Sequence, residues 1–333
     1  MTTAFFGELM LRLSPPGREL LLQTPKLEVN VGGAEANVAT GLSCLGHPVR
    51  MISAVADNPL GAGVIGELRR RGVDTTHVAV EDGRLGLYFL TPGAGLRASE
   101  VVYDREHSVF ADRAADSWDW DAALAGCTRL HLSGITPALG HNTATAAIAA
   151  AEAANAKGIA VSFDGNYRQK LWEAWDSDPR SVLTQLIGHA DILFGNHRDI
   201  SLLLGEDFSG EGSDRRREAA EAAFAHFPKL QKIASTARHV VDADSHRIAA
   251  RIDTREGAHQ TDEILVAGIV DRIGAGDAFA AGVLHGLLIG GDTRAAAKSG
   301  LALTGLKHSL PGDASLFTRA DLAAFGEGLD VRR

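Results

Sequence analysis

The sequence is poor in cysteine, lacks a long apolar run and carries no excess of positive charge. Its two cysteines, Cys44 and Cys127, have no paired spacing, so neither a disulfide framework nor a metal knuckle is expected. No basic region followed by a long apolar core opens the chain, and no later run approaches membrane-spanning length. A net charge of −9 disfavours nucleic acid as a ligand. We therefore expect a soluble cytoplasmic protein with neither a nucleic-acid nor a membrane partner.

Several common nucleotide-binding and metal-binding motifs are also missing. No glycine is followed by lysine, which excludes a Walker A loop. The glycines of residues 93–98 imitate a dinucleotide fingerprint, but a strand is predicted to follow where the fingerprint needs a helix. His197-Arg-Asp199 imitates a protein-kinase catalytic loop, yet Leu204 stands where the magnesium-binding asparagine would be. The 13 histidines lack the spacing typical of zinc sites. A dehydrogenase, a protein kinase and a zinc enzyme are thus disfavoured.

What is present is typical of an α/β protein. The chain has 333 residues, of which 45% are hydrophobic and 23% charged, with 37 glycines. Strands and helices alternate from residue 129 onwards, with expected strands at 129–133, 159–163 and 191–194. Parallel strands need the intervening helices as crossovers. We predict one large domain over residues 1–333, a mostly parallel sheet with helices on both faces.

Short strands without intervening helices predict a second, smaller sheet. One long strand is expected over residues 4–13, and short strands are expected at 19–23, 26–31, 77–80, 85–90 and 100–103. Such a small sheet cannot cover both of its own faces, so it should pack on a partner or close over a site. We therefore predict a β lid built from about residues 14–31 and 75–106.

The stretch at residues 264–282 predicts an anion site. An apolar run of strand length turns through Gly274, Ala275 and Gly276 into a helix. Such a turn leaves the first backbone N–H groups of the helix unpaired at the positive end of its dipole. Asp277 adds a carboxylate that can accept a hydroxyl proton, as phosphoryl transfer requires. The alternative is that Asp277 only caps the helix.

Other loops are expected to meet this turn. Ligands of open parallel sheets bind outside the carboxyl ends of the strands. The loops at residues 32–33, Asn166, Asn196 and Gly274 follow or adjoin such ends. We expect them to converge on one site.

Two stretches resemble the signatures of a known family, the ribokinase-like PfkB carbohydrate kinases. They are residues 31–46, VGGAEANVATGLSCLG, and residues 271–284, DRIGAGDAFAAGVL. Within the family, residues 7–15, 32–37, 131–137 and 164–172 are most similar to 2-keto-3-deoxygluconate kinases, and the last stretch is shared in part with fructokinases. The resemblance implies a ribokinase-like fold and phosphorylation of 2-keto-3-deoxygluconate to its 6-phosphate by ATP and Mg²⁺. It leaves a monovalent-cation requirement open.

The resemblance also implies roles for individual residues. Asp277 would be the base, and the backbone N–H groups of Gly274, Ala275 and Gly276 would form the anion hole. Substrate-binding roles fall to Gly33, Asn37, Tyr88, Tyr103, Arg105, Arg168, Asp277 and Asp313. A guanidinium suits the sugar-acid carboxylate because its fork binds two oxygens. Lid packing for the tyrosines and solvent exposure for the arginines remain alternatives.

The nucleotide side departs from the family pattern. Asn196 and Asp199 take the place of the Asn-x-x-Glu motif, which organises magnesium through water, so no direct protein ligand to the metal is expected. The alternative is that the two residues only cap a helix. Residues 234–239, ASTARH, replace the usual Lys-x-Gly-x-x-Gly segment. Thr236 and Arg238, with Gly274 and Gly276, are then the candidates for nucleotide binding.

Two rival functions stay open at this point. One is another sugar kinase of the same family, of the fructokinase or ribokinase type. The other is a non-catalytic sugar-binding or nucleotide-binding regulator, which the altered segment at 234–239 motivates. In either case a small molecule is the expected ligand, and a homodimer through the lids, or a higher homo-oligomer, is the expected assembly.

Overall fold

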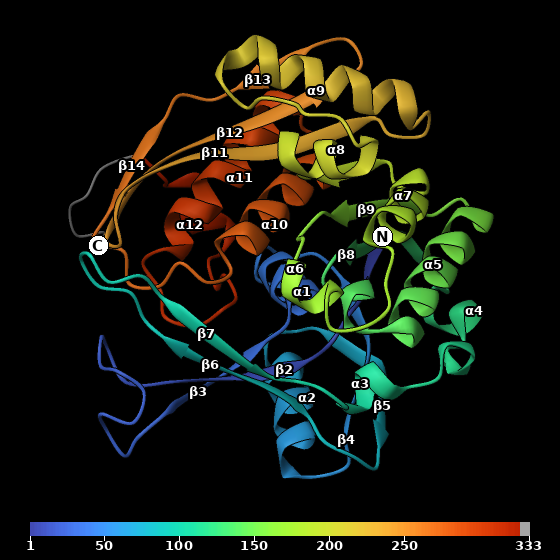
Figure 1. Ribbon diagram of the computed structural model, residues 1–333, viewed down its shortest axis with the longest axis vertical. Coiled ribbons are helices and arrows are strands. Elements are labelled where there is room, and N and C mark those ends of the chain that lie inside the picture. Colours follow the sequence, from blue (N-terminus) through green and yellow to red (C-terminus); the bar gives the residue numbers. More distant parts are fainter. Residues whose placement is uncertain (327–333) are drawn as a thin grey trace.

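The computed structural model describes residues 1–326, so the end of the predicted span 1–333 lies outside the described residues (Figure 1). A large sheet runs through the molecule in the order β13-β12-β11-β10-β9-β8-β1-β4-β5, with β14 paired to β12. Its strands are β1 (Thr2–Phe6), β4 (Val49–Ala56), β5 (Asp74–Glu81), β8 (Cys127–Ser133), β9 (Ala160–Asp164), β10 (Ile192–Phe194), β11 (Lys232–Asp242), β12 (Ser245–Thr254), β13 (Ala258–Gln260) and β14 (Ile264–Ala267). Pairing is parallel from β5 to β11 and antiparallel beyond.

Helices cover both faces of this sheet, as predicted. Successive residues of a strand point to opposite faces, and all three residues of β10 are buried, as are the middle three of β9. The long helices are α1 (Ala34–Cys44), α2 (Pro59–Arg70), α5 (His141–Ala156), α7 (Pro179–Gly188), α8 (His197–Leu204), α9 (Gly212–His226), α10 (Ala275–Leu288) and α11 (Thr293–Lys307). Short helices are α3 (Val109–Asp112), α4 (Trp120–Ala123), α6 (Gln169–Trp172) and α12 (Arg319–Ala323). Helix α10 packs between α1 and α11, and α5 packs on β8, β9 and α7. None of these helices, within residues 1–326, has the length and apolar character needed to cross a membrane.

The predicted small sheet is present and separate from the large one. Its order is β3-β2-β6-β7, with β2 (Met10–Ser14), β3 (Glu28–Gly32), β6 (Gly86–Thr91) and β7 (Glu100–Asp104). Strand β7 is exposed along its whole length, whereas Tyr88 and Leu90 of β6 are buried. Figure 1 shows the sheet, in blue and cyan, extending away from the body beside the helices.

Three sequence expectations about the small sheet are wrong. The single strand expected over 4–13 is two strands in different sheets, because the chain bends at Gly7, where a Cβ would overlap the Glu35 carboxylate. The strand expected at 19–23 is a turn, in which Leu22 has φ 65°. The segment 75–106 begins too early for the lid, because β5 pairs in parallel with β4 and so belongs to the large sheet.

Candidate active site

The glycine turn leads into α10 in a geometry that only glycine tolerates. Gly274 is the N-cap of α10 with φ 75°, in the left-handed region, and a Cβ there would overlap the carbonyl oxygen of Asp313. No side chain among residues 1–326 caps the helix. The Ala275 N–H donates to the Arg272 carbonyl at 3.3 Å, and the neighbouring N–H groups at the start of α10 keep their capacity to bind an anion. The turn thus has the backbone arrangement that the sequence predicts.

Asp277 lies in the first turn of α10 and is partly exposed. Its Oδ2 accepts a hydrogen bond from the Asn37 amide of α1, at 2.6 Å. Burial raises the pKa of Asp277 to about 7; the Asn37 bond opposes this shift, and the charges of Asp313 and Glu35 add to it. A carboxyl group with a pKa near 7 suits a general base at neutral pH.

Two more carboxyl groups lie near Asp277, from the ends of neighbouring strands. Asp164 ends β9, and Asp199 lies at the start of α8, just after β10. Burial, with the charges of Asp277 and Asp199, raises the pKa of Asp164 to about 8. Burial also raises the pKa of Asp199. The three groups form an acidic region that a cation would stabilise in its ionised form.

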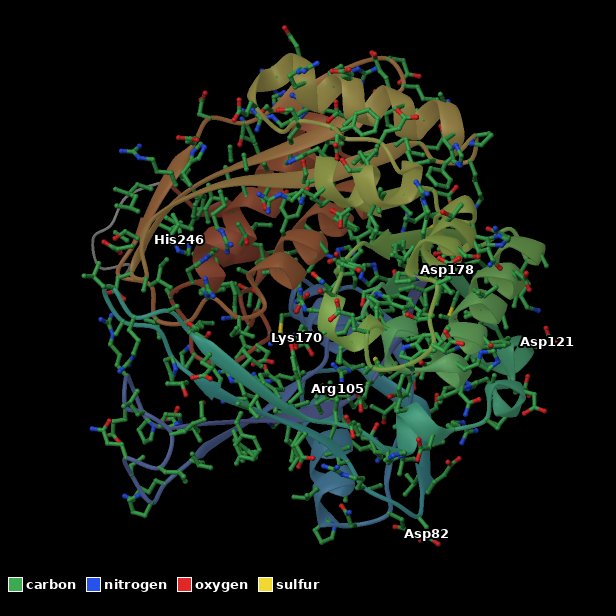
Figure 2. The ribbon with its side chains drawn as sticks, in the orientation of Figure 1. Asp82, Arg105, Asp121, Lys170, Asp178 and His246 are labelled. Carbon is green, nitrogen blue, oxygen red and sulfur yellow. The ribbon has the colours of Figure 1, made fainter. Side chains whose placement is uncertain are left out.

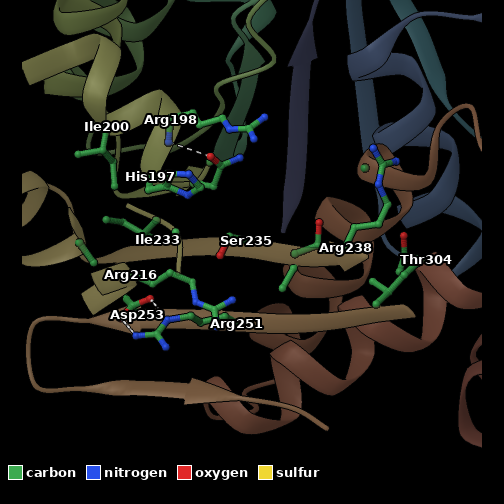
Figure 3. A pocket seen from close by; sticks show the side chains of 18 of the residues that line it. His197, Arg198, Ile200, Arg216, Ile233, Ser235, Arg238, Arg251, Asp253 and Thr304 are labelled. Atoms are coloured by element: carbon green, nitrogen blue, oxygen red, sulfur yellow. Dashed lines mark hydrogen bonds and ion pairs between the residues drawn. The ribbon is translucent and has the colours of Figure 1, made fainter. Parts of the chain in front are cut away.

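A basic cavity of about 520 Å³ lies on the other side of the α10 N-terminus. Thr236 and Arg238 line it from β11, together with Ala275 and Gly276 (Figure 3). Residues 234–239 form part of a continuous strand rather than a loop, since β11 pairs with β12 along this whole segment. Side chains, in place of glycine backbone, therefore line this wall.

The positive charge of the cavity comes from three elements. Arg198 of α8, Arg216 of α9 and Arg238 line it, and within residues 1–326 none of the three has an acidic partner at ion-pair distance, in contrast to Arg251, whose Nε lies 2.7 Å from Asp253 (Figure 3). Burial and the charges of Arg198 and Arg216 lower the pKa of His197. Burial and the charge of the exposed Arg272 lower the pKa of Arg238. An entering phosphate chain would relieve this repulsion.

The acidic region and the basic cavity are continuous. A second cavity, of about 660 Å³, is lined by Asp164, Arg168 and Asp199 and shares Asn196, Arg238 and Gly276 with the first. The helix N-terminus therefore borders two cavities that share part of their lining, and Asp164 and Asp199 line only the second.

Asn196 and Asp199 form a capping box at the start of α8. The Asn196 side chain accepts from the Arg198 N–H at 2.9 Å, and Asp199 Oδ2 accepts from the Asn196 N–H at 2.7 Å. Both residues therefore cap α8, and a role with magnesium stays a prediction. Within the described residues, no group of three His, Cys, Asp or Glu side chains could hold a metal ion directly. Carboxylate oxygens that act through water would fit Mg²⁺ here.

Arg105 is engaged inside the protein instead of facing an open site. It is 6% exposed and pairs with Glu8, whose Oε2 accepts from Arg105 Nε at 2.9 Å (Figure 2). Its Nη1 has no hydrogen-bond partner among the described residues. Only this nitrogen would be free to meet a substrate in the present arrangement.

Tyr88 and Asp313 are likewise bound to each other. The Tyr88 hydroxyl donates to Asp313 Oδ2, and the pKa of Tyr88 is raised by burial and by the Asp313 charge. Arg12 of β2 lies 3.0 Å from Asp313 Oδ1 and 2.7 Å from Asp271 Oδ2, and its side chain is 2% exposed. Both acids are thus part of a buried ionic network that joins the small sheet to the turn before α10.

The remaining predicted residues surround this region. Gly33 is the N-cap of α1 with φ 138°, and a Cβ there would overlap the Glu8 carbonyl oxygen. Tyr103 is 42% exposed on β7, with its ring 6.0 Å from that of Tyr88. Arg168 is exposed at the start of α6, and its charge lowers the pKa of both Asp164 and Asp277. Only Arg168, of the two arginines predicted to bind a sugar-acid carboxylate, is free of an acidic partner among the described residues.

Four charged residues that contact or lie near the predicted ones were not predicted, namely Glu8, Arg12, Glu35 and Asp164. Glu35 is 1% exposed, accepts from Ser133 and Thr136 through Oε1, and has a pKa raised by burial. Each of them lies within or beside a stretch that resembles the family. A charged residue within an otherwise apolar stretch of sequence was the signal that could have identified them.

Comparisons with known proteins agree on one family. A family model described as "pfkB family carbohydrate kinase" matches residues 2–317. A 2-dehydro-3-deoxygalactonokinase of Haloferax volcanii is 31% identical over 98% of this chain and 96% of its own. A 2-dehydro-3-deoxygluconokinase of Bacillus subtilis is 29% identical over 96% and 94% of the two chains. The solved 2-dehydro-3-deoxygluconokinase of Thermotoga maritima is 35% identical, with a TM-score of 0.93 over 98% of this chain and 100% of that one.

The buried ion pairs of Arg12 predict that its replacement strongly lowers the stability of the folded protein. Arg12→Met would leave Asp271 and Asp313 buried with one cation fewer, so we expect a loss of about 3–5 kcal/mol in the free energy of unfolding, measured by urea denaturation. Arg18→Met is the control, because the Arg18–Asp244 pair is partly exposed and should contribute less than about 1 kcal/mol. Equal losses in the two variants would contradict this reading of the network.

Proposed function

The chain belongs to the pfkB family of carbohydrate kinases, as its two signatures predict, and we propose that it phosphorylates a 2-keto-3-deoxy sugar acid with ATP. The proposed substrate is 2-keto-3-deoxygluconate, also named 2-dehydro-3-deoxygluconate, and the product its 6-phosphate. The observation that carries the proposal is Asp277, a carboxyl group with a pKa of about 7 beside the uncapped N-terminus of α10.

Asp277 would accept the proton of the attacking hydroxyl. Its deprotonated form is needed for this step, and near neutral pH about half of the molecules have it. The Asn37 amide holds Oδ2, which fixes the orientation of the carboxylate. The N–H groups of Gly274, Ala275 and Gly276 would stabilise the negative charge on the transferring group.

The basic cavity would hold the phosphates of ATP. Arg198, Arg216 and Arg238 supply positive charge where the family's usual glycine-rich segment is absent. Mg²⁺, when bound, neutralises phosphate charge, and Asn196, Asp199 and Asp164 would hold it through water. The residues fit both groups, because arginines without an acidic partner among residues 1–326 would face the phosphates and carboxyl groups with raised pKa values would face the cation.

The substrate class rests on Arg168 and on the relatives. Arg168, which has no acidic partner among residues 1–326, lines the second cavity with Asp164 and Asp199, and its guanidinium could bind a carboxylate of the substrate there. The relatives reported above act, by their names, on keto-deoxy acids of the gluco and galacto series, which differ in the configuration of one carbon. Phosphorylation of a neutral sugar is the first rival. A regulator without turnover is less well supported, because Asp277 and the glycine turn are both in place.

We also propose a homodimer that covers the outer face of the small sheet. Val29 and Val102 are exposed there, by 58% and 49%, on the face opposite Arg12 and Tyr88. Light scattering should find a dimer, and Val102→Lys should shift it toward monomer because a charge would enter the interface. A monomeric wild-type protein at micromolar concentration would exclude this assembly.

The role of Asp277 predicts a pH profile. kcat/KM should rise with pH through about 7 and then level off, since the base must be ionised. Asn37→Leu should move this rise to higher pH, because the amide that lowers the pKa of Asp277 is lost. Asp277→Asn should reduce kcat by roughly 100- to 10,000-fold with little change in KM.

Asp292→Asn is the matched control for Asp277→Asn. Asp292 is an exposed acid that caps α11, and asparagine caps a helix equally well. Its kcat should equal that of the wild type. A fully active Asp277→Asn enzyme would remove Asp277 from the proposed mechanism.

A substrate panel tests the proposed function as a whole. An ATP-coupled assay should find the highest kcat/KM with 2-keto-3-deoxygluconate or its galacto epimer, and lower values with fructose and ribose. Arg168→Ala should reduce kcat/KM for the acids by about 100-fold, and by much less for neutral sugars, because it removes a charge-assisted bidentate contact.

Lys170→Ala serves as the control for Arg168→Ala, because Lys170 is an exposed cation on the same short helix, α6 (Figure 2). It should leave the substrate preference unchanged. Preferred turnover of fructose would refute the substrate class. Ligand binding without turnover of any sugar would favour the regulator.

A further inference from the structure

Lys307 is a buried cation that the proposed reaction does not use directly. It is the last residue of α11, and its relative exposure is 0%. Burial lowers the pKa of Lys307, whereas the charges of Asp271 and Asp313 raise it. An ammonium group is costly to bury unless acceptors surround it. The acceptors in this case are main-chain carbonyl oxygens.

The ammonium group joins the two segments that shape the α10 N-terminus. Nζ donates to the Asp271 carbonyl at 3.4 Å, which precedes the glycine turn, and to the Leu310 carbonyl at 3.1 Å, which precedes Asp313. The two segments also contact each other directly, because the Gly312 N–H donates to Asp271 Oδ2 at 3.1 Å. Gly274 packs against the Asp313 carbonyl in turn. Lys307 therefore lies behind the turn that would bind the transferring phosphoryl group.

The family resemblance leaves open whether the protein requires a monovalent cation. Such a cation would need carbonyl oxygens as ligands at this place, as the Lys307 ammonium group does. Bare K⁺ or Na⁺ is held by several carbonyl oxygens that replace its hydration shell. Two of the carbonyl oxygens that the Asp271 and Leu310 segments present here already accept from Lys307. The arrangement does not fit a monovalent cation at this position.

We propose that the Lys307 ammonium group is a built-in cation that positions the anion-binding turn, so that phosphoryl transfer needs no bound K⁺ or Na⁺ at this position. The inference rests on the proposed phosphoryl transfer. Lys307 lines neither of the two cavities beside the α10 N-terminus, so it is a positioning residue. It ties the Asp271 segment to the Leu310 segment, and its positive charge also acts on Asp277.

The first measurement is kcat of the wild type in KCl and in tetramethylammonium chloride at equal ionic strength. The two values should agree, because no mobile cation takes part. Lys307→Ala should lower kcat by about 100-fold at an unchanged KM for the sugar acid, since a shift of about 1 Å in a catalytic group costs about that much. Added K⁺, NH₄⁺ or methylammonium should restore part of the loss, and tetramethylammonium should not, because it is too large for the space.

Two further variants serve as controls. Lys307→Met removes the charge but fills the space, so it should lose the same activity and show no rescue by cations. Lys298→Ala removes an exposed lysine from the same helix and should behave as the wild type. A wild-type enzyme that depends on K⁺, or a Lys307→Met enzyme with full kcat, would overturn the proposal.

A thermal measurement separates this inference from the proposed function. The melting temperature of Lys307→Ala should rise with added KCl or NH₄Cl relative to tetramethylammonium chloride, and those of the wild type and Lys307→Met should not. This readout does not need a substrate. Absence of kinase activity in the wild type would refute the proposed function, whereas absence of the cation effect on melting would refute the role of Lys307.

Discussion

The buried contact of Arg12 with Asp271 and Asp313 is the interaction on which the rest of the site depends. It brings together β2 of the small sheet, the segment that leads into α10 and the loop after α11. Three charges with almost no exposure to water are stable only in a defined geometry, because each loses its hydration and must be compensated by its partners. The turn at Gly274 is therefore held from two sides, by β2 through Arg12 and by α11 through Lys307.

The division of charge across the α10 N-terminus is the second organising constraint. Arginines from α8, α9 and β11 line one cavity beside it, and carboxyl groups from β9, α8 and α10 repel one another next to it. Such unrelieved charges reduce the stability of the folded protein, and they are retained where a ligand can compensate them. A nucleotide with its metal carries both the negative and the positive charge that this cleft lacks.

Local sequence signals were sufficient to predict the architecture, but they did not predict which residues pair over long distances in the sequence. Apolar runs, helix patterns and the Gly274 turn predicted the parallel sheet, α10 and the separate small sheet, because each depends on residues close in the sequence. The break at Gly7 was missed because it results from the approach of Glu35, and the extension of β11 through Arg238 depends on its pairing with β12. The partners of Arg12 lie more than 200 residues away in the sequence. The resemblance implies that Arg105 is free to bind a substrate, but its guanidinium pairs with Glu8. The roles of the individual site residues remain predictions.

The short link from β1 to β2 limits how this protein could be recombined. One continuous stretch of chain occupies an interior position of the large sheet, between β8 and β4, and three residues later an interior position of the small sheet, between β3 and β6. The small sheet is therefore not one continuous segment of the chain, and it could not be exchanged between relatives or removed by breaking the chain at two loops. A chimaera with a foreign small sheet would have to exchange β3 separately from β6 and β7, because α1, β4, α2 and β5 lie between them in the chain, and it would have to keep its own β2 with Arg12. Strands β6 and β7 can therefore vary separately from β2, which stays joined to β1 of the large sheet.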